Sequence, residues 1–161
     1  SSRYVVVATF YCQCKVGVNS MARKYAKRLL QLREEVLQFK EVASKLQQQE
    51  SMLYKEENRF LAALSALVSI SDTKVQFTYG CMSFVIEMGA KGKYLASYSL
   101  DTPDEEIEKY INEIGLSQAT AKSLYLIEHS DSIVDACIDA LKEKNEDLNQ
   151  ATKLLAKSLS E

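Results

Sequence analysis

Residues 18–79 contain neither glycine nor proline, the two residues that most often interrupt a helix. Within this span apolar side chains recur at alternating steps of four and three residues, which is the heptad pattern of a coiled coil. We therefore predict a coiled-coil helix over residues 18–71. The predicted oligomerisation residues, all at a or d positions of the heptads, are Leu29, Leu32, Val36, Phe39, Leu46, Leu53, Phe60 and Leu64.

This helix needs a partner because of its length. About 45 residues of helix extend roughly 65 Å, too far to be covered by the rest of so short a chain. We expect it to pair with a second copy or with a related chain. Glu50 and Glu57 occupy two successive a positions, where a buried carboxylate is costly unless it is paired. We expect them to fix the register or to select a partner with Lys or Arg opposite. A helical hairpin that turns back near Gln47-Gln48-Gln49 is the alternative that periodicity leaves open.

An apolar run precedes the helix. Tyr4–Cys12 alternates β-branched and aromatic residues, which predicts an N-terminal strand within residues 1–17. It is the longest strongly apolar stretch and is too short to span a bilayer. The chain is 47% apolar and 26% charged and holds four cysteines without repeated spacing. These features exclude a membrane protein, a collagen and a disordered tail, and they favour a soluble protein with reduced thiols in the cytoplasm or nucleus.

Three further alternating runs follow the helix and predict an antiparallel β-meander over residues 72–100. Gly80 marks a turn or a bulge, and residues 89–92 form a hairpin loop. The N-terminal strand can add to this sheet. One face of the sheet must be covered, and we expect the end of the long helix to cover it.

Residues 101–161 carry repeated helix-start signals. Thr102-Pro103-Asp104-Glu105 predicts a capping box, and Gly115 ends the helix that it starts. The later predicted starts are Ser117, one of Ser130, Asp131 and Ser132, and Asp147. The predicted fold class is α+β, with a long coiled-coil helix, a small antiparallel β-meander and a C-terminal bundle of four short helices.

Catalytic chemistry has little support in the sequence. His129 is the only histidine, so a nucleophilic scheme would need it, with Asp131 or Asp135 to orient it and Ser123 or Cys137 as nucleophile. These residues lie at a helix junction without the glycines of a nucleophile elbow. We predict no catalytic residue and treat an enzyme as the weakest class.

Metal, cofactor and nucleic-acid sites are also disfavoured. Cys12 and Cys14 share one face of the predicted strand, but the other possible zinc ligands, Cys81, Cys137 and His129, are scattered along the chain. No glycine-rich loop precedes a helix, so no nucleotide cofactor is predicted. The basic residues at 23–28 have no aromatic platform beside them, and we interpret them as a solvated helix flank.

Charge divides the chain into two parts. Residues 1–79 hold 12 of the 20 Lys and Arg but 7 of the 22 Asp and Glu, so the acidic charge is concentrated after residue 79. A partner of this acidic part should present a basic surface.

A short motif lies in the acidic part. Ile114-Gly115-Leu116 stands between two predicted helices, Ala121 and Leu124 lie within the second, and Ala140-Leu141 closes the third. Residues 103–155 therefore resemble a ubiquitin-associated (UBA) helical module, and a second, overlapping unit would close with Leu154-Leu155. The resemblance implies partner binding, with ubiquitin as the candidate, through Ile114, Gly115, Leu116, Ala140, Leu141, Leu154 and Leu155.

Two functions follow. The first is a non-enzymatic oligomeric adaptor that binds a protein partner through its acidic C-terminal helices. The alternative is a structural coiled-coil subunit of a larger heteromeric complex, of a kinetochore or chaperone type, that does not bind ubiquitin. Glu50 and Glu57 within the heptads favour the alternative, because such positions select a partner.

Overall fold

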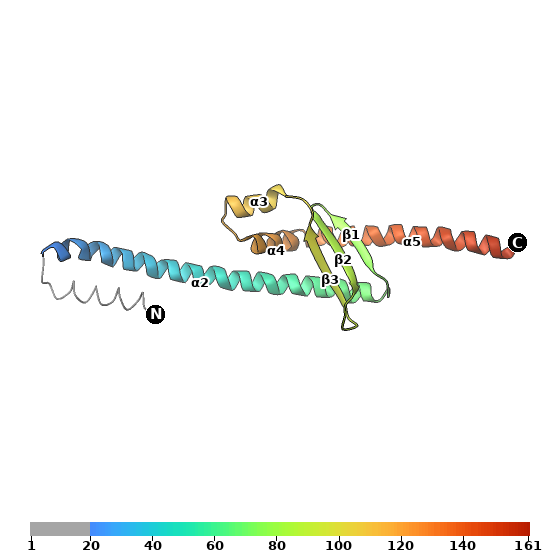
Figure 1. Cartoon of the computed structure of the whole chain (residues 1–161), viewed down its shortest axis with the longest axis horizontal. Coiled ribbons are helices and arrows are strands. Elements are labelled where there is room, and N and C mark those ends of the chain that lie inside the picture. Colours follow the sequence, from blue (N-terminus) through green and yellow to red (C-terminus); the bar gives the residue numbers. More distant parts are fainter. Residues whose placement is uncertain (1–19) are drawn as a thin grey trace. The chain divides into compact units, whose positions relative to one another are not determined.

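A computed structural model describes residues 20–161 (Figure 1). The predicted N-terminal strand, within residues 1–17, lies outside the described residues. The elements are α2 (Ser20–Ser69), β1 (Val75–Tyr79), β2 (Met82–Met88), β3 (Tyr94–Leu100), α3 (Glu105–Asn112), α4 (Gln118–Glu128) and α5 (Ser130–Ser160). The mixed class of helices with a small antiparallel sheet is thus confirmed. The chain divides between Gln49 and Glu50 into two units.

The long helix predicted from the missing glycine and proline is confirmed. α2 is a single helix of 50 residues, so the hairpin alternative, which required a break near Gln47-Gln48-Gln49, is wrong. The absence of breakers leaves each backbone N–H in this stretch free to bond four residues back. The first unit contains α2 up to Gln49, and the second contains its remaining turns.

The sheet has the strand order β1-β2-β3, and both pairings are antiparallel. Tyr79 pairs with Met82, so Gly80 and Cys81 form a two-residue turn, and the turn rather than the bulge is correct. Gly80 has a φ of 54°, which disfavours other residues. A Cβ at Gly80 would also lie 3.1 Å from the Tyr125 hydroxyl oxygen. Both the backbone and the close approach of α4 therefore favour glycine at this turn.

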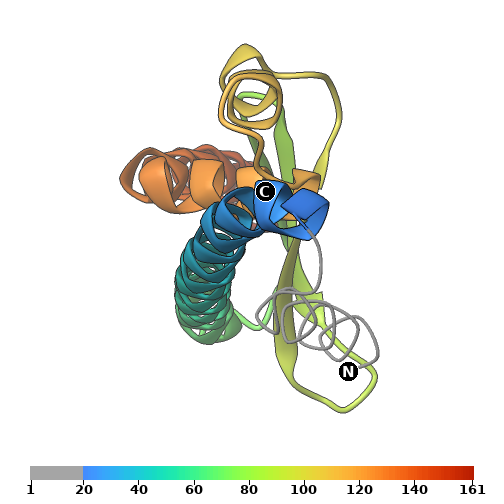
Figure 2. The same ribbon diagram turned by 90° about the vertical axis from the view of Figure 1, so that its left-hand side faces the viewer.

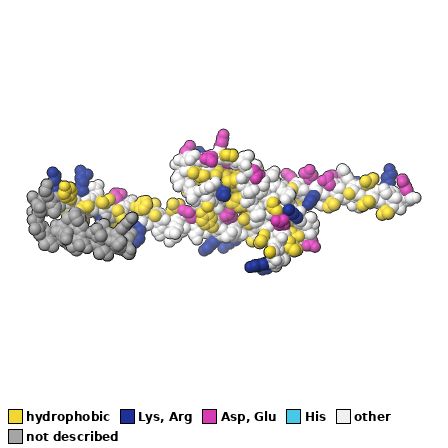
Figure 3. Space-filling model, viewed as in Figure 1, with side chains coloured by type: hydrophobic (Ala, Val, Ile, Leu, Met, Phe, Trp, Pro, Cys, Tyr) yellow, Lys and Arg dark blue, Asp and Glu magenta, His cyan; other side chains and the backbone are white. Residues whose placement is uncertain are grey.

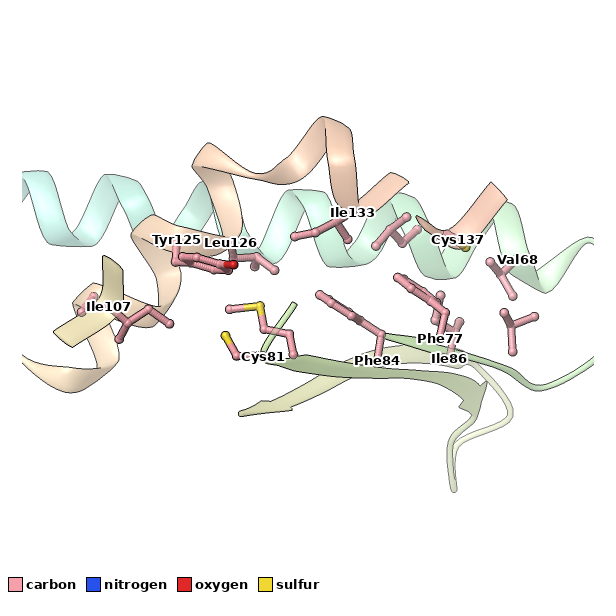
Figure 4. Close-up of a cluster of buried hydrophobic side chains, with 14 residues drawn as sticks. Val68, Phe77, Cys81, Phe84, Ile86, Ile107, Tyr125, Leu126, Ile133 and Cys137 are labelled. Atoms are coloured by element: carbon pink, nitrogen blue, oxygen red, sulfur yellow. The ribbon is translucent and has the colours of Figure 1, made fainter. Parts of the chain in front are cut away.

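One face of the sheet forms the core of the second unit (Figure 4). Phe77 and Phe84 pair across β1 and β2, and their rings stack with centroids 4.8 Å apart. Val68 of α2 and Ile133 of α5 belong to the core that covers this face (Figure 4). The helices α2 and α5 lie on the same side of the sheet (Figure 2). The expected cover by the end of α2 is correct, and α5 adds a second helix that was not expected. Residues on the opposite face, such as Gln76 and Thr78, are exposed, which explains the alternation in the sequence.

The C-terminal helices differ from the prediction in number. The third and fourth predicted helices are one helix, α5, of 31 residues. No break occurs at Asp147, so the expectation of four short helices is wrong. Asp147 looked like a cap because Gln150 follows it, yet both side chains are exposed on a continuous helix surrounded by good helix formers.

Two of the predicted caps also change. Asp104, not Thr102, is the N-cap of α3, and its carboxylate accepts from the backbone N–H groups of Glu106 and Ile107. Ser117 caps α4 as predicted, by accepting from the N–H of Thr120. α5 starts after His129 without a side-chain cap, so none of the three predicted caps serves it.

Candidate interaction surfaces

The first unit presents an apolar helix face. We call Leu32, Val36, Phe39 and Leu46 the α2 stripe; their exposed fractions are 57%, 45%, 74% and 48%. Leu29, one turn earlier, is partly buried. Figure 3 shows hydrophobic side chains along this helix. Large apolar side chains this exposed and this regularly spaced are typical of interaction surfaces.

The other predicted oligomerisation residues lie in the second unit and are partly or fully buried there. Leu64 has an exposed fraction of 7% and belongs to the core, and Phe60 packs against that core. Leu53 is partly buried. The assignment of Leu64 to an interface between chains is therefore corrected. The heptad spacing continues into the buried turns of α2, because a sheet can cover an apolar helix face just as a second helix can.

Glu50 and Glu57 have partners within the chain. The Thr120 hydroxyl donates to Glu50 Oε2 at 3.0 Å, and the Ser123 hydroxyl donates to Glu57 Oε2 at 2.8 Å. The Tyr98 hydroxyl donates to the other Glu57 oxygen. The expectation that these carboxylates serve to select a partner chain is thus replaced by an internal role, in which they bind α2 to α4 and β3.

The predicted loop Ile114-Gly115-Leu116 forms the turn between α3 and α4. The Gly115 N–H donates to the Ile111 carbonyl at 3.2 Å, and the Leu116 N–H donates to the Tyr110 carbonyl at 3.0 Å. Gly115 has a φ of 81°, as a helix-ending glycine requires. Ile114 has an exposed fraction of 60%, whereas Leu116 packs against the core. Of the three residues, Ile114 offers the most side chain to a partner.

The closing pair Ala140-Leu141 lies elsewhere, on the part of α5 that packs against the sheet core. Both residues are partly buried against that core. Ala140 lines a cavity of about 650 Å³ between α5 and the edge strand β1, together with Phe77, Asp139 and Glu143. The turn at Ile114 and the pair at Ala140 therefore belong to different parts of the fold (Figure 1). Sequence reasoning missed this cavity, because its walls depend on where α5 crosses the sheet.

Leu154 and Leu155 lie near the end of α5. Their exposed fractions are 65% and 62%. They are accessible to a partner, as the predicted second surface requires. The helix break expected before them is absent, so they extend the same helix as Ala140 and Leu141.

His129 belongs to a polar network instead of a nucleophilic triad. Its Nε2 donates to Glu106 Oε2 at 2.8 Å, and its Nδ1 lies 2.8 Å from the Tyr79 hydroxyl. The Tyr110 hydroxyl lies within hydrogen-bond distance of the other Glu106 oxygen and of Glu128, and its single proton can be donated to either carboxylate. This network connects β1, α3 and the junction of α4 with α5, which identifies it as a structural link between these elements.

The network shifts the acidity of its members. Hydrogen bonds from His129 and Tyr110 lower the pKa of the Glu106 carboxyl, because they stabilise its charged form. Burial, followed by its bonds to Glu128 and Glu106, raises the pKa of the Tyr110 hydroxyl. Both groups thus keep their ordinary charge at neutral pH.

The hydrogen bonds of His129 go to Glu106 and Tyr79 and not to the other catalytic candidates. Ser123 donates to Glu57, and Asp131 and Asp135 are exposed on α5. Cys137 is buried, and this burial raises the pKa of its thiol, which disfavours the reactive thiolate.

Residues 20–161 contain no group of three or more His, Cys, Asp or Glu side chains placed to hold a metal ion. The predicted pair Cys12 and Cys14 lies outside the described residues. In the described part of the chain, no helix is both long enough and apolar enough to cross a membrane.

Comparisons with protein families, with curated proteins and with solved structures find no match to this chain. Its surfaces are therefore the basis for any functional conclusion.

Proposed function

We propose that this protein is a non-enzymatic adaptor that self-associates through the α2 stripe and binds a protein partner on its acidic C-terminal part. The observation that carries the proposal is the exposure of Leu32, Val36, Phe39 and Leu46 at heptad spacing. Burying such side chains between two helices contributes about 1.5–3 kcal/mol each. Two copies of the partner surface on one assembly would also increase the avidity for a multivalent ligand.

The internal partners of Glu50 and Glu57 support self-association over a heteromeric structural role. Those carboxylates were the reason to expect a basic partner helix, and Thr120, Ser123 and Tyr98 now account for them. The stripe that remains, from Leu32 to Leu46, has apolar residues or alanine at each a and d position. Such a face needs no oppositely charged partner.

Sedimentation equilibrium of the purified chain tests self-association. We expect Leu46→Glu to shift the chain toward monomer, because it places a carboxylate within the apolar interface. Gln48→Glu is the matched control, since it adds the same charge at an f position away from the stripe. A wild-type chain that is monomeric at all concentrations would instead support the heteromeric alternative.

We expect the partner to bind at one of two exposed places. One carries acidic charge, and the other is a turn that ends a helix. The first is the cavity beside β1, where Asp139 and Glu143 flank Ala140. The second is the turn at Ile114. An acidic rim attracts a basic partner, speeds association and makes binding weaken with salt.

Ubiquitin is the first partner to test, because the resemblance of residues 103–155 to UBA modules implies it. Titration of isotope-labelled ubiquitin with the chain should give chemical-shift changes that Ile114→Asp removes. Glu113→Gln, next to Ile114, serves as a control that leaves the apolar contact intact. If wild-type chain causes no shifts at high micromolar concentration, ubiquitin is not the partner, and the acidic cavity becomes the site to probe with basic peptides.

A further inference from the structure

α5 carries a second heptad repeat, which the predicted break at Asp147 concealed. Leucines recur every seven residues at Leu141, Leu148 and Leu155. The positions three residues before and four residues after each leucine complete the heptad pattern. In this repeat the a positions are Ile138, Asn145, Thr152 and Leu159, and the d positions are Leu141, Leu148 and Leu155.

The leucine row continues the face that α5 buries against the sheet. Cys137 is buried there, and at 3.6 residues per turn Leu141, Leu148 and Leu155 fall within about 40° of it around the helix. The Lys144 ammonium donates to the Lys74 carbonyl at 3.0 Å, next to the start of β1. Beyond this point the row is uncovered in the described chain: the exposed fractions of Leu148 and Leu155 are 64% and 62%.

We propose that this heptad face of α5 binds the same face of a second copy of the chain, as a parallel, in-register pair. The composition of the face favours this occupant. In the free part of α5 leucine fills both d positions and β-branched Thr152 stands at a; leucine at d with a β-branched residue at a is typical of two-stranded parallel coiled coils. This pairing is independent of the α2 stripe, because it involves a different helix and a different set of residues.

Asn145 determines the direction and the register. In a parallel, in-register pair, each Asn145 faces the Asn145 of the other copy, and the two amide groups can hydrogen-bond. In an antiparallel pair the a position faces d, so each amide would face leucine and lose its hydrogen bonds on burial. In a parallel pair shifted by one heptad, Asn145 would face Thr152 of the other copy, and Leu155 would have no leucine opposite it. Asn145 therefore favours the parallel, in-register pair over other arrangements of the same two helices.

The flanking positions allow two copies to approach. In a parallel pair each g residue faces the e residue of the following heptad, which brings Lys144 near Asn149 and Ala151 near Ala156. Neither pair has like charges. The acidic residues Glu143, Glu146 and Asp147 fall at positions f, b and c, outside the interface.

The free part of α5 spans fewer than three heptads, so the pair alone is expected to be weak. It should strengthen with chain concentration, and any association of the same chains elsewhere would raise the effective concentration of α5.

Cysteine cross-linking of the full chain tests the proposal. We would treat Asn145→Cys and Gln150→Cys with a short bismaleimide, and the parent chain, which has four cysteines of its own, gives the background. Position 145 faces its copy in the proposed pair, whereas position 150 is an f position on the far side. We expect the cross-linked dimer to form at least about fivefold more with Asn145→Cys than with Gln150→Cys.

Adding Leu148→Glu to Asn145→Cys should reduce the cross-link to background, while adding Lys153→Glu, at a b position, should leave it in place. Because Leu148 is exposed, Leu148→Glu should keep the helical circular dichroism of the single chain. The same comparison can be made in chains that also carry Leu46→Glu. If Asn145→Cys still cross-links more than Gln150→Cys there, α5 pairs without the α2 stripe. Equal yields at positions 145 and 150, or no loss with Leu148→Glu, would overturn the proposal.

Discussion

Glu57 shows how one residue in a heptad pattern can serve the fold of its own chain. Its two carboxylate oxygens accept from Ser123 of α4 and Tyr98 of β3. Ser123 is almost fully buried, and burial together with the bond to Glu57 raises the pKa of the Tyr98 hydroxyl. A carboxylate with two hydroxyl donors is stable in a partly buried place where an unpaired one would not be.

We therefore predict that Glu57→Ala lowers the free energy of unfolding by about 2 kcal/mol, because it leaves both hydroxyl groups without their acceptor. Glu56→Ala is the matched control, since Glu56 is exposed and pairs with Arg59 at the surface. It should cost less than about 0.5 kcal/mol. Urea unfolding followed by circular dichroism measures both. Equal effects of the two substitutions would contradict the internal role of Glu57.

Glu106 makes the second unit sensitive to acid. Its folded pKa lies below the ordinary value of 4.5, because His129 and Tyr110 donate hydrogen bonds to it. A group with a lowered folded pKa contributes stability above its unfolded pKa and loses it as the pH falls through the folded value. The contribution of Glu106 should thus be complete above about pH 5 and decline below pH 4.5.

Glu106→Gln should therefore destabilise the protein at neutral pH and lose this effect in acid. We expect the difference in unfolding free energy between wild type and variant to shrink steadily as the pH falls below 4.5. Urea titrations at several pH values measure this difference. Glu105→Gln, the neighbour on α3, controls for the loss of one charge. A difference that stays constant with pH would show that Glu106 gains nothing from His129 and Tyr110.

At the scale of elements, the start of α3 tests which signal in the sequence sets the helix boundary. Asp104 accepts from the N–H of Glu106 at 2.9 Å and of Ile107 at 3.2 Å, whereas Thr102 precedes the cap. We predict that Asp104→Ala costs about 1 kcal/mol and Thr102→Ala less than about half of that. Thermal unfolding monitored by circular dichroism compares them. A larger loss with Thr102→Ala would restore the capping box expected from the sequence.

The sequence predicted elements that local chemistry determines. The three strands follow from the alternation of residues such as Phe77 with Thr78, and α2 follows from its lack of breakers. The sequence failed where distant residues decide. Asp147 resembles a helix start, but good helix formers on both sides keep α5 continuous. No local signal indicates that Glu57 meets Tyr98, because the two are 41 residues apart.

Of the candidate surfaces, likewise, one could be predicted from the sequence and another could not. The spacing of residues such as Val36 and Phe39 predicted an apolar helix face, and these residues are exposed as a docking face requires. The cavity beside β1 could not be predicted, because it needs Asp139 and Phe77 to lie near each other in the folded chain. Leu116 is predicted to be a docking residue, but its side chain packs against the core and therefore stabilises the fold.

At the scale of the whole molecule, folding and association should be coupled. If chains pair through apolar helix faces, the paired state is stabilised by mass action, and unfolding depends on the chain concentration. Residues such as Leu46 and Leu148 affect this dependence even though they lie outside the core of the second unit. The core itself, around Phe84 and Ile133, should unfold at the same temperature at any concentration once pairing is removed.

We therefore predict that the thermal midpoint of the wild-type chain rises with concentration, and that a tenfold increase stabilises a dimer by about 1.4 kcal/mol. The double variant Leu46→Glu with Leu148→Glu should show no such rise, because both apolar faces then carry a carboxylate. Gln48→Glu with Lys153→Glu is the control, with its substitutions on the outer faces of the same helices. Differential scanning calorimetry over about a hundredfold range of concentration measures the effect. A wild-type midpoint that does not move would mean that neither helix face joins copies of this chain, and it would direct the search to a different partner.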